Sequence, residues 1–175
     1  MGEVGEFNPK SSLPSEFEYV DLGSVVGTTL QSHRTENKNT APSRAQRLAR
    51  RGDVFYQTVR PYQKNNYLFD LPYSNFVFST GYTQLRPHGD GNFLLNRLQE
   101  ERFVNTVLDN STGTSYPSIN SSDLKEIKIF IPGGNDEQVK IGNLFQLLDK
   151  TTSLHSKKIE NLTTLKTALL QKMFT

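Results

Sequence analysis

The order of hydrophobic and polar positions divides the chain into a strand-rich first part and a helical last part. Apolar and polar residues alternate within residues 17–26, 51–59 and 74–87, and β-branched and aromatic side chains are frequent in all three. This pattern predicts strands that bury one face or both. The last of these segments predicts two short strands around Gly81.

The spacing of apolar residues changes at residue 89. Between residues 89 and 110, leucine, valine and phenylalanine recur at intervals typical of a helix, which predicts one helix over this range. Asp90 or Asn92 is placed to cap its start, and Asn110 and Gly113 to end it.

A second apolar run predicts one more strand. The residues IKIFI occupy positions 127–131 and stop at Pro132, which has no backbone N–H for a sheet. A small polar loop, GTSYPS at residues 113–118, precedes this strand.

From Asp136 onward the pattern is helical throughout. Asp136 is placed as a cap, and residues 151–173 contain neither glycine nor proline. At 1.5 Å per residue this last stretch spans roughly 35 Å, more than one small domain covers. We expect it to project and to seek another helix, the alternative being that it folds back on its own domain. Its apolar stripe predicts dimerisation through Leu148, Ile159, Leu162, Leu165, Leu169 and Met173.

These elements predict an α+β protein with two parts. Residues 1–135 form a globular mixed α/β domain, and residues 136–175 form a long coiled-coil-like helical region. No segment is long and apolar enough to predict a membrane span, and the first ten residues do not resemble a signal peptide. We therefore expect a cytoplasmic protein.

The distribution of charge indicates a polyanionic partner. The chain has a net charge of only +2, yet residues 34–64 carry eight basic and two acidic residues, a local charge of +6. Such a stretch is typical of a phosphate-binding surface, although a solvated arginine-rich loop has the same composition. The candidate phosphate contacts are Arg34, Lys38, Arg44, Arg47, Arg51 and Lys64.

Two polar segments carry side chains suited to DNA. In RPYQKNNYLF, residues 60–69, arginine, glutamine and asparagine are the types that hydrogen-bond base edges. Ordinary turns remain the alternative for both segments. The candidate base contacts are Arg60, Gln63, Asn65 and Asn66, and the loop candidates are Thr114, Ser115 and Tyr116.

Signals for catalysis are weak. DLPY at residues 70–73 is close to a methyltransferase motif, but no glycine-rich motif for a methyl-donor nucleotide accompanies it. EIK at residues 126–128 is close to a nuclease motif, but this pattern is common by chance. The chain has no cysteine and no phosphate-binding P-loop, and its three histidines lie far apart in sequence. We predict no catalytic residue, no cofactor and no metal site.

Several segments, in order, resemble the specificity subunit of type I restriction–modification enzymes. They include EYVDLGSV, RGDVFYQTVRP, FVFSTGYTQLRP and GTSYPSINSSDLKEIKIFIP, followed by the long helix from EQVKIGNLFQLLDK onward. The resemblance implies a non-catalytic target recognition domain that reads one half of a split site in double-stranded DNA. It also implies helices that dock methyltransferase subunits and, where present, restriction subunits.

A full specificity subunit resembles two tandem copies of this unit, and this chain contains one. The chain is therefore interpreted as a natural half subunit or as a piece of a longer protein. In either case the stripe on its last helix lacks the partner that a second copy supplies. We expect an antiparallel two-fold dimer, with recognition domains about one turn of DNA apart and an interrupted palindrome as target. The alternatives are a DNA-processing enzyme and a protein-interaction adaptor without DNA contact.

Overall fold

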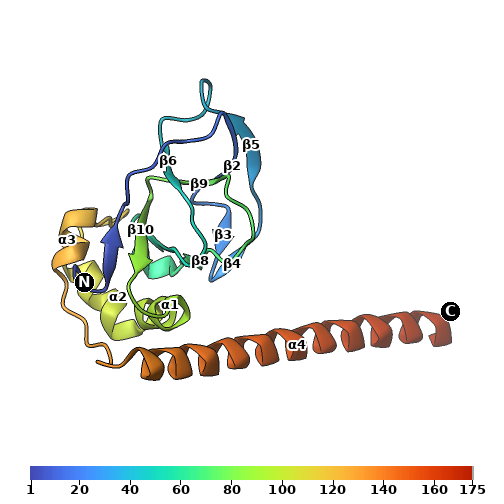
Figure 1. Ribbon diagram of the computed structural model, residues 1–175. Helices are drawn as coiled ribbons and strands as arrows, with labels where there is room; N and C mark the ends of the chain where they lie inside the picture. Colours follow the sequence, from blue (N-terminus) through green and yellow to red (C-terminus); the bar gives the residue numbers. More distant parts are fainter. Residues whose placement is uncertain (175) are drawn as a thin grey trace.

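A computed structural model describes residues 1–174 of the chain and shows a globular domain from which one long helix projects (Figure 1). Two four-stranded sheets and a small hairpin form the strand-rich part of the domain. Three short helices flank the first sheet, and the fourth helix extends away from the domain (Figure 1). The predicted α+β class and the projecting helix are confirmed.

The first sheet is antiparallel and has the strand order β1-β10-β7-β8. Its central strands are buried on both faces, which explains why their sequences contain few charged residues. The strands are β1 (Gly5–Phe7), β7 (Val54–Gln57), β8 (Tyr67–Leu68) and β10 (Tyr82–Pro87).

The second sheet has the order β5-β2-β9-β6, in which β2 and β9 run parallel and the other pairs antiparallel. A separate hairpin is formed by β3 (Val25–Val26) and β4 (Thr29–Leu30). The strands of the second sheet are β2 (Glu16–Val20), β5 (Arg34–Asn37), β6 (Ala45–Leu48) and β9 (Phe76–Ser79).

Alternation along β7 connects the hydrophobic clusters. Val54 and Tyr56 face a cluster with the helices, whereas Phe55 faces an aromatic cluster between the sheets. Phe55 and Phe78 stack there, with ring centroids 3.7 Å apart. Because both faces of β7 are buried, the segment that follows it is held at a fixed place in the domain.

The predicted helix over residues 89–110 is two helices, α1 (Gly91–Gln99) and α2 (Glu101–Asp109). The chain is extended at Glu100, with φ −64° and ψ 134°. Leu98 and Phe103 are both buried in the same cluster but lie five residues apart. A straight helix would turn Phe103 away from the face of Leu98, so the break lets both side chains reach the core. The caps were predicted correctly, because Asp90 accepts a hydrogen bond from Phe93 N at 2.7 Å and Asn110 ends α2.

The predicted strand at residues 127–131 is wrong. This segment pairs with no strand within residues 1–174, although Ile127 is buried and Ile129 packs against the same cluster. Its alternation reflects one-sided packing of an extended connector rather than a ladder. A short helix that the sequence did not predict, α3 (Ser121–Glu126), precedes it and is capped by Asn120.

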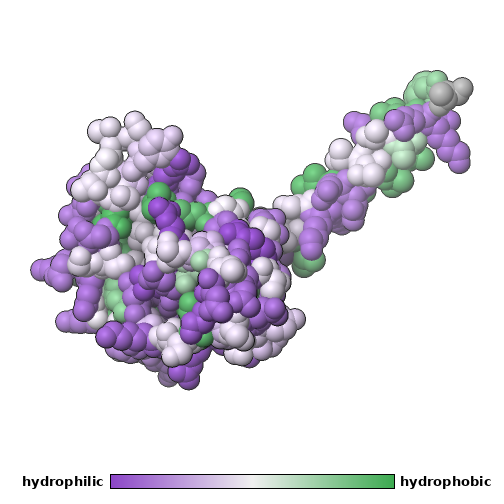
Figure 2. All heavy atoms as spheres, turned by 90° about the horizontal axis from the view of Figure 1, so that it is seen from above, coloured by the Kyte–Doolittle hydropathy of each residue, from purple (hydrophilic) through white to green (hydrophobic). Residues whose placement is uncertain are grey.

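The last helix, α4 (Asn135–Phe174), is continuous over 40 residues. It is therefore about 60 Å long. It begins at Asn135, so Asp136 lies in the first turn rather than at the cap position that the sequence predicted. Gly142 is its buried residue, where α4 crosses the start of α1. All described residues from 147 onward are exposed, and hydrophobic side chains gather along this part (Figure 2). Within residues 1–174, no helix combines the length and apolarity needed to cross a membrane.

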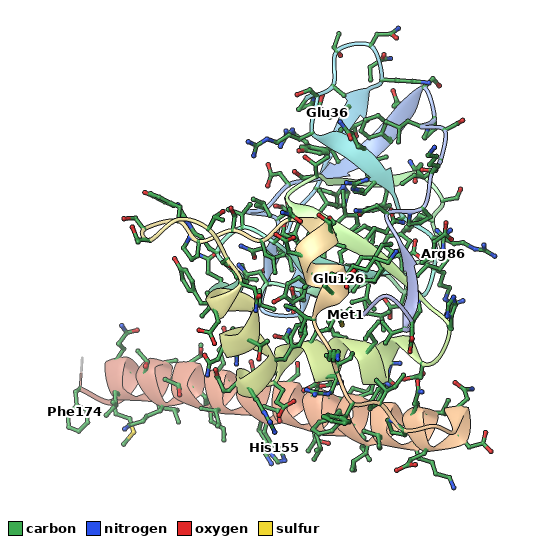
Figure 3. The ribbon with its side chains drawn as sticks, turned by 90° about the vertical axis from the view of Figure 1, so that its left-hand side faces the viewer. Met1, Glu36, Arg86, Glu126, His155 and Phe174 are labelled. Atoms are coloured by element: carbon green, nitrogen blue, oxygen red, sulfur yellow. The ribbon has the colours of Figure 1, made fainter. Side chains whose placement is uncertain are left out.

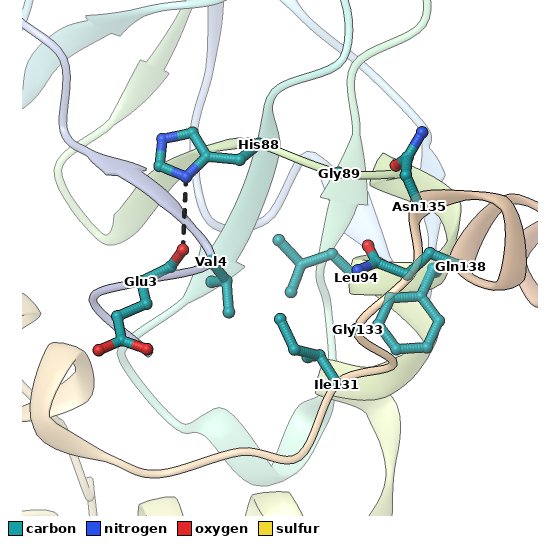
Figure 4. Close-up of a pocket in the computed structure, with 10 residues that line it drawn as sticks. Glu3, Val4, His88, Gly89, Leu94, Ile131, Gly133, Asn135 and Gln138 are labelled. Atoms are coloured by element: carbon teal, nitrogen blue, oxygen red, sulfur yellow. Dashed lines mark hydrogen bonds between the residues drawn. The ribbon is translucent and has the colours of Figure 1, made fainter.

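The junction between domain and helix encloses a small hollow of about 180 Å³ (Figure 4). Gln138 donates from Nε2 to the carbonyl of Pro132 at 3.0 Å, and His88 donates from Nδ1 to the carbonyl of Glu3 at 3.3 Å. Backbone from β1, the β10–α1 turn and the start of α4 meets here. These contacts, with Gly142, hold the first turns of α4 against the domain.

Candidate nucleic-acid interface

The polar segment after β7 forms a single-turn helix, η1 (Pro61–Gln63), between two residues with left-handed backbone. Arg60 has φ 54° and Lys64 has φ 55°, an uncommon conformation for residues other than glycine. The Arg60 N–H donates to the carbonyl of Pro117 at 2.8 Å. The segment is therefore fixed by contacts with a loop more than 50 positions away in sequence.

That loop is the polar stretch GTSYPS, which the sequence placed before a strand. Ser118 forms a β-bridge with Val59, and Ile119 N donates to the carbonyl of Thr58 at 3.0 Å. Tyr116 is exposed, and its ring lies 4.3 Å from the Arg60 guanidinium carbon in a cation–π contact. The structure thus joins the two polar segments that the sequence analysis singled out separately.

A hollow of about 390 Å³ lies beside η1 and the β3–β4 hairpin, and we call it the β3–η1 hollow. Gln63 accepts at Oε1 from Gln57 Nε2 at 2.9 Å, and Asn65 accepts at Oδ1 from Gly27 N at 2.9 Å. Its lining includes Leu22, Val25, Val26, Arg60, Gln63 and Asn65. Three of the four candidate base contacts therefore surround one concave surface.

Asn66, the fourth candidate, is not available to a ligand. It is 1% exposed, and its Oδ1 accepts from the backbone N–H of Gln57 at 2.8 Å. Lys64 is also occupied, because its Nζ lies 2.5 Å from Glu101 Oε1. Thr114 and Ser115 are exposed beside Tyr116 in the polar loop.

The candidate phosphate contacts differ in how they are held. Arg34 is paired with Asp21 at 2.9 Å and Glu36 at 2.7 Å. Hydrogen bonds to Glu36 and Asp21 raise the pKa of Arg34, so its charge is already matched within the protein. Lys38, Arg44 and Arg51 are exposed, and their charge faces solvent.

Arg47 is the candidate with an unmet polar atom. It lies on β6, an edge strand of the second sheet, and its Nε is buried without a hydrogen-bond partner in the described part of the chain. Burial lowers the pKa of Arg47, but an arginine stays protonated at neutral pH. A partly buried cation with an unpaired donor is well suited to an anionic ligand.

The two weaker catalytic motifs lie in different segments of the structure. Glu126 ends α3 and Lys128 is exposed on the connector after it. Tyr73 of DLPY is exposed and stacks on Phe76, with ring centroids 5.8 Å apart. Among residues 1–174, no three histidine, aspartate or glutamate side chains are grouped closely enough to hold a metal ion.

Comparison with known proteins gives the family. A family model described as Type I restriction modification DNA specificity domain matches residues 35–164. This chain belongs to that family. The match includes η1, the polar loop and most of α4, so both parts of the molecule belong to a specificity domain.

Individual relatives of this specificity domain agree with the family model. The chain is 23% identical over 163 residues to the type I restriction enzyme HindI specificity subunit of Haemophilus influenzae, covering 89% of this chain and 35% of that protein. It also resembles the crystal structure of the HsdS subunit from Thermoanaerobacter tengcongensis, with 28% identity and a TM-score of 0.71. That likeness covers 87% of this chain and 41% of the HsdS chain.

A second solved structure has the same arrangement. It concerns complex assembly and conformational transition of the type I R-M system, and its matching chain is 26% identical with a TM-score of 0.76. The match covers 91% of this specificity domain and 43% of that chain. The chain therefore spans about a third of its curated relative and about two fifths of the solved ones.

The sequence missed the residues that hold the site together. Gln57 lies within a predicted strand and Gly27 directly follows one, yet both fix side chains at the β3–η1 hollow. Their hydrogen bonds connect positions up to 38 residues apart, so no local pattern indicates them. The adjacent asparagines at 65 and 66 were the available sequence signal for this site, but the sequence does not show which of the two side chains faces solvent.

Proposed function

We propose that this chain is a sequence-specific DNA-recognition subunit of a type I restriction–modification system. In this proposal residues 1–135 read one half of a bipartite site in double-stranded DNA. Residues 136–175 dock methyltransferase subunits and, where present, restriction subunits; Thr175 lies outside the described residues. The chain itself has no catalytic step and works in the cytoplasm beside its DNA.

The observation that carries this proposal is the meeting of the two polar segments beside one concave surface. Arg60, Gln63 and Asn65 of the first segment line the β3–η1 hollow, and Tyr116 of the distant polar loop contacts Arg60. Such a surface offers directed hydrogen bonds and an aromatic face, which base recognition requires. Family membership makes DNA the ligand to test first.

The exposed helix supports the second half of the proposal. Ile159 and Leu162 of α4 are 65% and 55% exposed, and a soluble helix rarely leaves so continuous a stripe uncovered. We propose that α4 pairs antiparallel with α4 of a second copy. The projecting part, residues 147–174, is about 42 Å long, so the two recognition domains lie slightly more than one turn of DNA apart.

Binding to duplex DNA at several salt concentrations tests the proposal. The parent chain, with methyltransferase subunits present, should prefer its target over random duplex, and its affinity should fall steeply with salt. Arg44→Ala should weaken binding to both DNAs alike and lower the salt slope by about one. Absence of binding at low salt, even with methyltransferase subunits, would favour an adaptor that does not touch DNA.

A further inference from the structure

The polar side chains on the rim of the β3–η1 hollow all present hydrogen-bond donors to the outside. Arg60 has only donors in its guanidinium group. The Oε1 of Gln63 and the Oδ1 of Asn65 already accept from Gln57 Nε2 and Gly27 N, each at 2.9 Å. Within residues 1–174, the amide nitrogens of Gln63 and Asn65 have no acceptor. The rim therefore offers donors to a ligand.

The orientation of the Gln63 amide is fixed by Gln57. Gln57 is 2% exposed, and its Nε2 donates to the carbonyl of Val59 at 2.6 Å as well as to Gln63. Turning the Gln57 amide over would bring two oxygens together at Val59. Gln57 Oε1 remains buried without a partner in the described chain, which is the cost of this orientation. Gln63 must therefore turn its oxygen inward and its nitrogen outward.

The β3–β4 hairpin fixes the Asn65 amide in the same orientation, with its oxygen inward and its nitrogen outward. The Gly27 N–H can only donate, so the atom of Asn65 that faces it must be the oxygen. Gly27 has φ 60°, a conformation that suits glycine at a hairpin turn. Arg60 is held separately, by its contact with Tyr116. Two independent hydrogen bonds thus orient the amides of Gln63 and Asn65, and Arg60 can only donate whatever its contacts.

We propose that this rim reads guanine, through the O6 and N7 acceptors on its major-groove edge. The inference rests on the proposed function and adds the class of base that the site takes. Guanine presents two neighbouring acceptors, whereas a bidentate contact to adenine needs both the oxygen and the nitrogen of one amide. Here the amide oxygens are engaged. Arg60 and Gln63 are the specificity-determining residues, and Gln57 is a positioning residue.

Gln63→Glu tests the proposal with almost no change of shape. The variant keeps an oxygen facing Gln57 Nε2 and replaces the outward N–H donor by an acceptor. Full-length parent and variant chains, each with methyltransferase subunits, select duplexes from a pool randomised over more than two half-sites, and the bound fraction is sequenced. The parent should enrich guanine, and the variant should lose that preference at one position by about tenfold, moving toward cytosine, whose N4 donates.

Two further variants distinguish base reading by Gln63 from an effect of charge and from misfolding. Asn105→Asp makes the same charge change on the exposed face of α2 and should leave the selected sequence unchanged. Gln57→Met removes the donor that orients Gln63. The Gln63 amide can then turn over, so the variant should bind adenine as well as guanine at that position. A variant that merely misfolded would lose binding to all sequences instead of broadening its preference.

Replacing guanines of the selected sequence by 7-deazaguanine completes the test. The loss of N7 at the position read by Gln63 should weaken parent binding about tenfold and should have no effect in Gln63→Glu. If Gln63→Glu weakens all sequences alike and keeps the parent motif, or if that motif lacks guanine, the inference is wrong while the proposed function stands. If the parent enriches no sequence, the proposed function fails and the inference fails with it.

Discussion

At the scale of single residues, a buried carboxylate organises the core at the start of β7, the strand that leads to the candidate site. Asp53 is 1% exposed and accepts from Arg86 Nε at 2.9 Å and from Gln84 Nε2 at 2.6 Å. It also accepts from the backbone N–H of Arg50 at 2.8 Å. The hydrogen bond to Asp53 raises the pKa of Arg86. Asp53 thus joins the β6–β7 turn to β10.

Asp53→Asn should lower the free energy of unfolding by about 3 kcal/mol, because it leaves Arg86 without its buried counter-charge. Chemical denaturation followed by circular dichroism measures this change. Asp70→Asn removes the same charge at an exposed site and should shift stability by less than about 0.5 kcal/mol. Equal effects of the two substitutions would contradict the structural role given to Asp53.

Residue chemistry also decides how much of the site the sequence could predict. Arg60, Gln63 and Asn65 stand out as candidates because their side-chain types and their short spacing are local properties of the sequence. Asn66 looks the same in sequence, but its oxygen satisfies the backbone of Gln57 in the interior. Whether a polar residue faces solvent or the core depends on the strand that packs beside it, and the sequence pattern does not name that strand.

At the scale of elements, periodicity predicted the strands whose own alternation of apolar and polar residues determines which faces are buried. The strands β7, β9 and β10 lie where alternation placed them. The segment 127–131 alternates as well, but a strand also needs the free edge of a sheet to pair with. Within residues 1–174 this segment pairs with no sheet. The break at Glu100 likewise depends on the shape of the core that both helices share.

The junction of α1 and α4 depends on a glycine. A Cβ at Gly142 would lie 2.2 Å from Asp90 Oδ1 and 2.9 Å from Phe93 N, the two atoms of the α1 cap. Gly142→Ala should therefore loosen the cap and shift the first turns of α4 away from the domain. Small-angle scattering should report a changed shape, and the melting temperature should fall by several degrees.

Gly134→Ala is the matched control for this junction. A Cβ at Gly134 meets nothing within 4 Å. The substitution should leave both the scattering profile and the melting temperature unchanged. A Gly142→Ala protein indistinguishable from this control would show that the close crossing does not set the position of α4.

At the scale of the whole molecule, a compact domain is joined to a helix whose far half is exposed throughout residues 147–174. His155 and Phe174 extend from α4 on the side away from the domain (Figure 3). Burying one large apolar side chain stabilises an assembly by about 1.5–3 kcal/mol before ordering costs. The exposed stripe of α4 therefore strongly favours a helical partner.

Leu162→Asp combined with Leu169→Asp should convert the proposed α4 dimer into a monomer at tens of micromolar, since each substitution places a charge in the apolar stripe. Light scattering gives the mass of the parent chain and of the double leucine variant. Thr164→Asp combined with Thr167→Asp is the control, because these residues are exposed on the face of α4 opposite the stripe and the charge change is the same. A parent chain that is already a monomer, with the same mass as the leucine variant, would contradict pairing through α4 and the palindromic target with it.

Methylation mapping of a genome with and without this chain tests the central claim most directly. The account predicts that one modified motif depends on the chain. For a dimer, that motif should be an interrupted palindrome whose halves lie slightly more than one turn apart. The same set of modified sites in both cells, with the methyltransferase subunits present in each, would contradict the assignment of DNA recognition to this protein.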